Sequence, residues 1–165
     1  NCATAIATVR NLQLGVKDEN IKEGITRIKS IARLQEIKSG KLKNICKYNR
    51  LYLDGSHNPL GAKALNEYLN TLDCKKHLIL GMMSNKDHEE YLSKFNNISS
   101  ITTIDIPNQP NAIKGKDLKE KLNKYPNVSY KKSIEEALNS LNLEKEDLIM
   151  ITGSLYLAGE LLNLN

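Results

Sequence analysis

The sequence predicts an α/β protein built on a Rossmann-like, mostly parallel sheet with helices on both faces. Short β-prone or continuously apolar segments alternate with segments whose apolar residues recur at helical spacing. Short connections join these segments, which is typical of stacked βαβ units. The predicted strands are apolar along nearly their whole length, as expected for a sheet that is covered on both faces.

Two helices are expected to precede the sheet. The apolar residues of segment 1–12 lie at helical spacing, and Asp18 can cap a second helix. The pattern changes near residue 30, so we expect residues 1–29 to end a preceding domain and residues 30–165 to form the Rossmann-like domain. The Lys-rich segment 38–50 is expected to form a hairpin or a loop ahead of the sheet.

The elements of the sheet domain can be placed along the chain. The expected strands are Leu51–Leu53, His77–Met83, Ile101–Ile106, Val128–Tyr130 and Asp147–Thr152. The expected helices carry their apolar stripes within residues 64–72, 91–95, 118–125, 134–141 and 154–163. The last helix is apolar on much of its circumference, so we expect it to be well buried.

Composition and charge argue against several classes of protein. The chain has 165 residues, 40% of them hydrophobic and 26% charged, which suits one ordinary domain with a short additional piece. The net charge is +5, but the lysines are spread evenly without a stripe of arginine and aromatic residues, so we expect no nucleic-acid partner. No apolar run approaches the roughly 20 residues of a membrane helix, so we expect no membrane partner.

Cysteine and histidine usage indicates neither disulfides nor a metal. Cys2, Cys46 and Cys74 are odd in number and far apart, and the histidines show no ligand spacing with them. We therefore expect a reducing, cytoplasmic location and no metal site. The chain does not begin with Met and shows no secretory signal, so we expect it to be a piece of a longer protein.

Ligands of open parallel sheets collect at the carboxyl ends of the strands, so the turns there are candidate sites. Asp54 ends a predicted strand, and Gly55 permits a sharp turn. Asn58 and Pro59 are suited to begin a helix. His57 follows Asp54 closely, so this turn offers two titratable groups for orienting a nucleotide or moving a proton. In the alternative interpretation, Asp54 only accepts hydrogen bonds from backbone N–H groups.

Two further turns carry candidate residues. Gly153 and Ser154 open the last helix, whose free N–H groups can bind an anion such as a carboxylate, with ordinary N-capping by Ser154 as the alternative. Lys86 can pair with a phosphate or carboxylate, or it can be solvated, while Asp87 is expected to cap the next helix. Residues 88–90 (His-Glu-Glu) lie on the exposed first turn of that helix, where acids are favoured without any metal.

The usual phosphate-binding motifs are absent from the sequence. No GxGxxG is present, and Gly40-Lys41 and Gly115-Lys116 lack both the upstream Gly and the following Ser or Thr of a P-loop. The chain by itself has no evident means of holding a triphosphate and its magnesium.

Four segments, in order along nearly the whole chain, resemble folylpolyglutamate synthase and dihydrofolate synthase of the Mur ligase superfamily. DGSHNPLGA resembles the DGAHNP-type motif, GSLYLAGE the GSLYL segment, GMMSNKD the glycine-to-Lys-Asp loop, and NCATAIA the NAATALA helix of the central ATPase domain. Several other Mur ligases carry a related His-Asn-Pro turn, whereas GSLYLAGE points toward the folate branch.

The resemblance implies the C-terminal third of an ATP-dependent ligase that adds L-glutamate to (tetrahydro)folate or dihydropteroate. In that family ATP phosphorylates the folate carboxylate, and the amine of glutamate attacks the acyl phosphate. The partners are then ATP, L-glutamate, a folate and the N-terminal ATPase domain of the same protein. The P-loop and the Mg ligands would lie in that preceding part, so this fragment alone is expected to be inactive.

Site residues follow from the same resemblance by position. Asn1, Arg33 and Asp54 would contact ATP. His57 would support the closed site as a positioning or proton-handling catalytic residue. Ser154 would help to receive the carboxylate of glutamate, and no metal ligand is expected in this chain.

One departure from the family pattern concerns the ATP-binding arginine. The family usually has Trp-Pro-Gly before it, where Ser30-Ile31-Ala32 stand here, and Arg27 is the alternative to Arg33. Two other functions remain open, namely another Mur-type amino-acid ligase and a stand-alone Rossmann-like binding module without catalysis.

Overall fold

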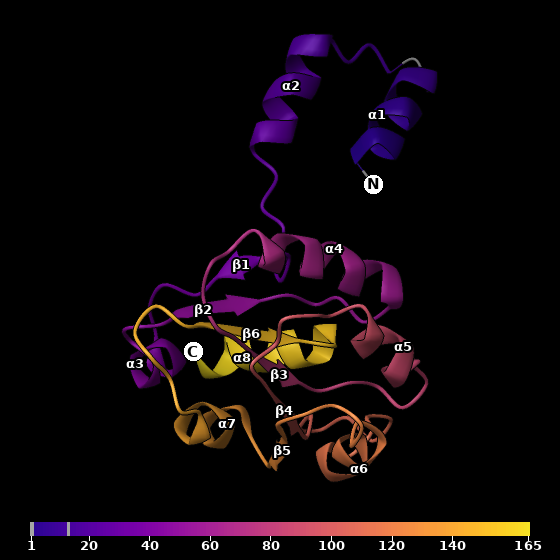
Figure 1. Cartoon of the computed structure of the whole chain (residues 1–165). Coiled ribbons are helices and arrows are strands. Elements are labelled where there is room, and N and C mark those ends of the chain that lie inside the picture. Colours follow the sequence, from indigo (N-terminus) through magenta and orange to yellow (C-terminus); the bar gives the residue numbers. More distant parts are fainter. Residues whose placement is uncertain (1, 13) are drawn as a thin grey trace. The chain divides into compact units, whose positions relative to one another are not determined.

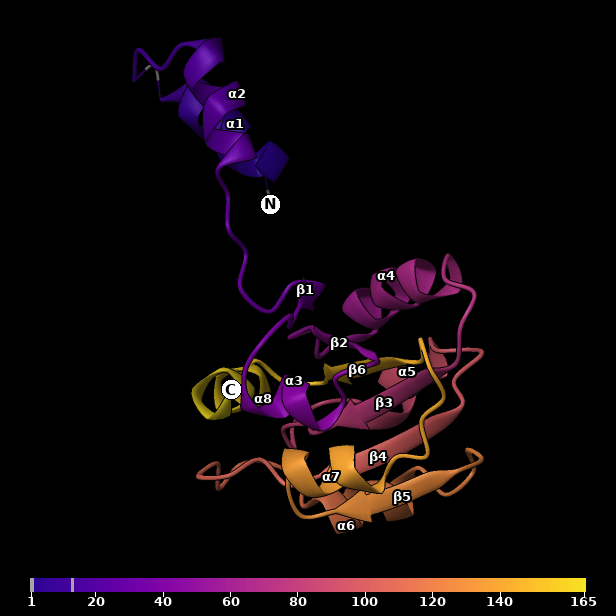
Figure 2. The ribbon, with the colours of Figure 1, turned by 90° about the vertical axis from the view of Figure 1, so that its left-hand side faces the viewer.

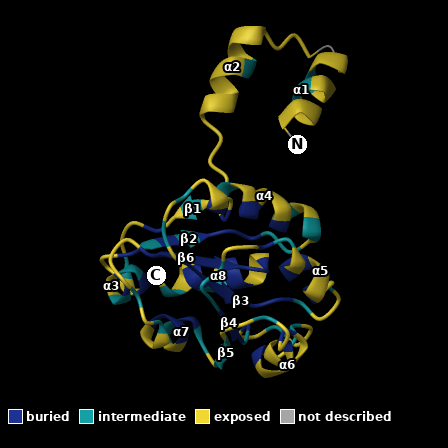
Figure 3. Cartoon of the chain, viewed as in Figure 1, coloured by how far each residue is buried: buried dark blue, intermediate teal, exposed yellow. Residues whose placement is uncertain are grey.

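Strands and helices alternate through most of the chain in the computed structural model, which describes residues 2–12 and 14–165 (Figure 1). The chain divides into two units, one ending at Ile31 and one running from Ala32 to Asn165. The first unit contains α1 (Cys2–Asn11) and α2 (Asp18–Thr26), and neither helix has a buried residue (Figure 3).

The prediction that Asp18 caps α2 is wrong by one position. Lys17 is the N-cap, and its N–H donates to the Asn20 side chain at 3.3 Å. Asp18 is instead the first helical residue, where an acid interacts favourably with the helix dipole, and it pairs with Arg10 at 2.8 Å.

The second unit contains a six-stranded sheet in the order β1-β2-β6-β3-β4-β5, which Figure 2 shows from the side. The strands are β1 (Gln35–Glu36), β2 (Arg50–Leu53), β3 (Lys76–Leu80), β4 (Ser100–Ile104), β5 (Val128–Lys131) and β6 (Leu148–Thr152). All neighbouring pairs are parallel except β1 with β2. This arrangement confirms the predicted Rossmann-like class.

Helices cover both faces of the sheet, as the sequence predicts. They are α3 (Lys41–Ile45), α4 (Pro59–Asn70), α5 (His88–Ser93), α6 (Gly115–Lys121), α7 (Ile134–Ser140) and α8 (Leu155–Leu164). Side chains of α3, α7 and α8 share one core cluster with Ile149 and Ile151 of β6. Side chains of α4, α5 and α6 share the other cluster with Leu148 and Met150. Successive side chains of β6 enter the two clusters in turn, because side chains along a strand point alternately to opposite faces of the sheet.

Two elements of the segment before β2 differ from the prediction. Residues 38–50 contain the short helix α3 rather than only a hairpin or loop, and β1 adds an antiparallel edge strand. Contacts from the other end of the chain stabilise α3, because the Asn165 side chain accepts a hydrogen bond from Leu42 N at 3.1 Å and the Asn165 carbonyl accepts one from Lys41 N at 3.3 Å. Such long-range partners leave no local signal in the sequence.

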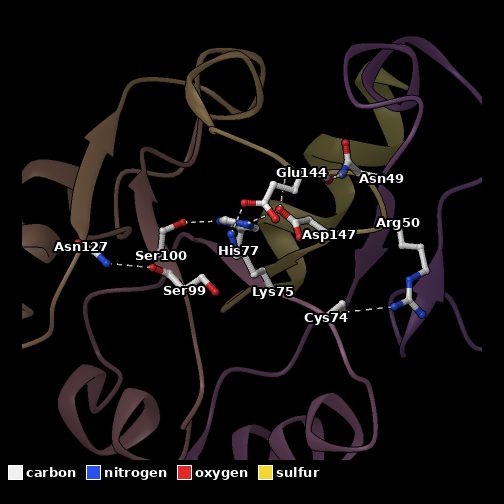
Figure 4. Close-up of polar contacts among 10 residues, drawn as sticks. All are labelled: Asn49, Arg50, Cys74, Lys75, His77, Ser99, Ser100, Asn127, Glu144 and Asp147. Atoms are coloured by element: carbon white, nitrogen blue, oxygen red, sulfur yellow. Dashed lines mark hydrogen bonds and ion pairs between the residues drawn. The ribbon is translucent and has the colours of Figure 1, made fainter.

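A polar cluster joins the starts of three strands at the amino edge of the sheet (Figure 4). His77 is 6% exposed, with Nδ1 2.7 Å from Ser100 Oγ and Nε2 3.3 Å from Asp147 Oδ2. Asp147 Oδ2 also accepts from Glu144 N at 2.8 Å. Both ring nitrogens are thus occupied, and the cluster fixes the register of β3, β4 and β6 at the edge opposite the candidate turns.

Candidate functional site

The turn after β2 is held by a carboxylate that accepts two backbone hydrogen bonds. Asp54 is 6% exposed; its Oδ1 accepts from Ser56 N and its Oδ2 from Leu34 N, both at 2.8 Å. The alternative role considered for Asp54, as acceptor of backbone N–H groups, is therefore present in the structure. Asn58 caps α4 by accepting from Gly61 N, as the sequence predicts.

Arg33 lies on a loop that Asp54 holds in an unusual conformation. Ala32 and Leu34, on either side of it, have φ of 54° and 45°, which is unfavourable for residues other than glycine. Gly55 N donates to the Ala32 carbonyl at 2.8 Å, and Asp54 binds Leu34 N. These bonds fix the loop, and the exposed Arg33 side chain lines a hollow of about 240 Å³ together with Asp54 and His57.

His57 presents one ring nitrogen to the site. Its Nδ1 lies 3.0 Å from the Gly55 carbonyl oxygen, which can only accept, so Nδ1 carries a proton and donates. In the neutral ring Nε2 is then an acceptor, free to take a proton from a ligand. His57 is half-buried and lines both the Arg33 hollow and a second, larger one.

The turn after β6 meets the turn after β2 because these parallel strands are neighbours. Gly153 N donates to the Ser56 carbonyl at 3.1 Å. Gly153 has φ of 105°, and a Cβ there would lie 2.7 Å from the Gly81 carbonyl oxygen, so only glycine fits. Ser154 is 2% exposed and caps α8 by accepting from Tyr156 N at 3.1 Å.

The larger hollow, of about 480 Å³, opens between these turns and the loops that follow β3 and β4. Its lining residues are His57, Met83, Ser84, Asn85, Lys86, Asn111, Ser154, Leu155 and Tyr156. The lining contains one lysine and one histidine but no carboxylate. Together with the positive N-terminal end of α8, this composition favours an anionic ligand.

The structure brings most of the predicted site residues together. His57 and Ser154 line the larger hollow, and Arg33 and Asp54 line the smaller hollow that shares His57. Asn1 lies outside the described residues. Arg27 belongs to the first unit, where it pairs with Glu23.

After β3 the predicted start of the next helix is confirmed, but the strand itself is shorter than predicted. Strand β3 ends at Leu80 rather than Met83, and Met83 pairs with Ala112 in an isolated antiparallel bridge. Asp87 caps α5 by accepting from Glu90 N at 2.8 Å, as predicted. The prediction that His88 lies on an exposed turn is wrong: the residue is 7% exposed, and its Nε2 bonds the Met83 carbonyl at 3.0 Å.

Sequence reasoning missed residues that reach the site from other elements. Asn111 follows β4 and lines the larger hollow, where its carbonyl accepts from both Ser84 N and Ser84 Oγ at 2.9 Å. Tyr91 of α5 lies behind the two turns and bonds Ser56 and Thr152. Neither belongs to a turn motif, and only the parallel strand order places them here.

Among the described residues, no group of three or more His, Cys, Asp or Glu side chains is placed to hold a metal ion. Over the same residues, no helix combines the length and the apolar character that crossing a bilayer requires.

Comparison with known proteins decides the family. Residues 32–155 match the family described as Mur ligase, glutamate ligase domain. This chain belongs to the Mur ligase family. A search of curated proteins finds no significant match.

Several solved structures resemble nearly the whole of this Mur ligase chain. It superposes on the bifunctional folylpolyglutamate synthase/dihydrofolate synthase of Yersinia pestis CO92 with a TM-score of 0.78 and 22% identity, covering 98% of this chain and 37% of that one. Folylpolyglutamate synthase of Thermotoga maritima gives a TM-score of 0.69 and 25% identity, with 98% of this chain and 37% of that one covered. A bifunctional folylpolyglutamate synthase/dihydrofolate synthase solved with Mn, AMPPNP and L-glutamate bound gives a TM-score of 0.78 and 21% identity, with 98% of this chain and 38% of that one covered.

The matches near 20% identity establish a shared fold. The chain spans only a little over a third of the length of these relatives, 37% for the first.

Proposed function

We propose that this chain is the C-terminal part of an ATP-dependent ligase that adds L-glutamate to a (tetrahydro)folate or a dihydropteroate. The observation that carries the proposal is the pair of adjoining hollows at the carboxyl edge of the sheet, which share His57. One hollow holds Arg33 for a nucleotide, and the other holds Lys86 and the start of α8 for an amino-acid carboxylate.

The proposed reaction is a transfer through an acyl phosphate. The terminal phosphoryl group of ATP moves to the folate carboxylate, and ADP leaves. The amine of glutamate attacks the acyl carbon, phosphate leaves with its bonding electrons, and the amide forms. The ammonium group of glutamate must lose a proton before it can attack as an amine, and His57 Nε2 is the acceptor that this chain offers for that proton.

The residue roles follow from this reaction. Arg33 neutralises phosphate charge with its guanidinium, and Asp54 holds the loop that carries it. Ser154 can donate its hydroxyl hydrogen to the glutamate carboxylate, since its Oγ only accepts from Tyr156 N in the helix cap. Lys86 supplies the positive charge of the same hollow. Asn1 contacting ATP stays a prediction.

The remaining substrates and ions would be bound mainly outside this chain. A related synthase was solved with Mn, AMPPNP and L-glutamate, which supports a divalent ion and a nucleotide for this protein. The ion, Mg in our proposal, would neutralise phosphate charge. Its ligands, the P-loop and most of the folate site are expected in a preceding ATPase domain that residues 1–29 would end, in a cytoplasmic enzyme.

The test is the turnover of the protein encoded by the complete gene. We expect ADP release that requires both a folate and L-glutamate. Turnover with uridine-linked peptides instead of folates would assign another Mur-type ligase. Nucleotide or amino-acid binding without turnover on either substrate would favour the binding module.

A substitution in the larger hollow tests its assignment to glutamate. Replacing Lys86 with Met removes its positive charge, so the KM for glutamate should rise about tenfold while the KM for ATP changes little. Lys63→Met, on the exposed part of α4, is the matched control and should leave both KM values unchanged. An equal effect of the two substitutions would exclude Lys86 from the glutamate site.

A further inference from the structure

A buried cluster of hydroxyl groups lies behind the two turns of the site. The Tyr91 side chain of α5 is fully buried, and its hydroxyl lies 2.8 Å from Thr152 Oγ1. The same hydroxyl lies 3.1 Å from Ser56 Oγ and 3.2 Å from the Ser56 carbonyl oxygen. One phenol therefore bonds both the turn after β2 and the last residue of β6.

Each partner of Tyr91 adjoins a proposed site residue. Ser56 directly precedes His57, and Thr152 is separated from Ser154 only by Gly153. The Ser56 carbonyl also accepts from Gly153 N, so the two turns are in direct contact at the position that the phenol reaches. The turns that carry His57 and Ser154 therefore meet at this cluster.

The chemistry of the Tyr91 phenol suits a fixed link. Burial raises the pKa of Tyr91 to about 12, so the hydroxyl keeps its proton throughout the neutral range. It can donate one hydrogen bond and accept others from the Ser56 and Thr152 hydroxyls. The ring packs against Phe95 with centroids 5.5 Å apart, which fixes the direction of the hydroxyl.

We infer that Tyr91 is a positioning residue that holds the His57 turn and the Ser154 turn together, so that the nucleotide and glutamate sites both depend on it. This inference rests on the proposed function for the identity of the two ligands. Tyr91 does not line either hollow, so it acts through Ser56 and Thr152 rather than by touching a substrate.

The test compares Tyr91→Phe with Tyr130→Phe. Phe at position 91 keeps the ring packing and removes only the hydroxyl. Tyr130→Phe is the matched control, since it removes a 2.8 Å hydrogen bond to Asp105 outside both hollows. One hydrogen bond corresponds to about a fivefold change in an equilibrium.

Two measurements separate positioning from plain stability. In the first, hydrogen exchange of the Ser56 and Gly153 amides should be about fivefold faster in Tyr91→Phe and unchanged in Tyr130→Phe. In the second, the complete protein carrying Tyr91→Phe should show about fivefold higher KM values for both ATP and glutamate, with kcat reduced less. Thr152→Val should change the exchange rates and the KM values in the same way, and combining it with Tyr91→Phe should add little, because both substitutions remove the same hydrogen bond. Thr152→Ser keeps the hydroxyl group and should retain the wild-type exchange rates and KM values.

The outcomes distinguish this inference from the proposed function. Unchanged exchange at both amides in Tyr91→Phe would overturn the inference whether or not the protein is a ligase. Faster exchange with unchanged KM values would also overturn it, by showing a link without consequence for binding. A wild-type protein without ligase turnover would refute the proposed function, and the exchange data would still decide whether Tyr91 links the turns.

Discussion

At the scale of single residues, Asp54 acts on the site through the loop that carries Arg33. Its two oxygens accept from Ser56 N and Leu34 N, and the loop between Ala32 and Leu34 has positive φ angles at both ends. Each such angle costs on the order of 1–2 kcal/mol outside glycine, so the loop needs these bonds to keep its conformation. The Asp54 carboxylate thus positions the loop that carries Arg33, whatever further contact it makes with the nucleotide that we propose.

Asp54→Asn should therefore destabilise the chain even though the side chain keeps its shape. The amide has only one oxygen, so one backbone N–H would face an NH₂ group instead of an acceptor. We expect a loss of about 1–3 kcal/mol in the free energy of unfolding, measured by urea denaturation. Asp73→Asn, at an exposed position, is the control. Equal stability of the two variants would contradict this role of Asp54.

The raised pKa of Tyr91 also leads us to expect that the free energy of unfolding depends on pH in the alkaline range. Its pKa is about 12 in the folded chain because of burial, whereas an unfolded tyrosine titrates near pH 10. Between about pH 10 and 12 the unfolded chain thus binds fewer protons, and stability falls as pH rises, by up to about 1.4 kcal/mol per pH unit from this group.

Urea denaturation between pH 9 and 11.5 checks this dependence. Tyr91→Phe should lose less stability over this range than the wild type, with the slope smaller by up to one proton. Tyr48→Phe removes a phenol that is 69% exposed and should retain the wild-type slope. Parallel curves for the wild type and Tyr91→Phe would show that the buried phenol ionises at an ordinary pH.

At the scale of elements, the connection between β6 and α8 requires glycine at one position and merely tolerates it at another. Gly153 has a positive φ, and a Cβ there would meet the Gly81 carbonyl and the Leu80 side chain at 2.7 Å. Gly159 lies inside α8, where a Cβ would meet nothing within 4 Å. The same substitution should therefore have opposite effects at the two positions.

Gly153→Ala should destabilise the chain by more than about 2 kcal/mol, from backbone strain and steric overlap. Gly159→Ala should stabilise it by about 0.5–1 kcal/mol, because alanine loses less conformational entropy than glycine in a helix. Thermal denaturation of both variants measures the difference. A Gly153→Ala protein as stable as the wild type would mean that the turn has another accessible conformation.

Some elements of the fold could be predicted from the sequence and others could not, depending on whether local or distant contacts stabilise them. Strand β6 and helix α4 were predicted within a few residues, because apolar periodicity and an Asn-Pro start are local signals. Helix α3 was missed because its first N–H groups bond Asn165, more than 120 residues away. The turns of the site carry local motifs, whereas Tyr91 reaches them only through the fold.

At the scale of the whole molecule, the hydrophobic core formed by the described residues lies in the second unit. Both core clusters consist of residues from Ala32 onward, whereas α1 and α2 contribute no buried residue. Stability of a domain depends chiefly on its buried apolar surface. The second unit therefore contains the core that it needs to fold by itself.

A chain of residues 32–165 should accordingly unfold cooperatively, with a Tm within about 2 °C of that of residues 1–165. A chain of residues 38–165 is the matched comparison, since it lacks Ala32 and Ile37, which are 2% and 4% exposed, together with strand β1. Removing buried apolar groups of this size should cost about 2–5 kcal/mol and lower the Tm by several degrees. Thermal unfolding followed by circular dichroism measures both. A 32–165 chain that melts broadly, or as low as 38–165, would show that the helices before Ala32 stabilise the sheet domain after all.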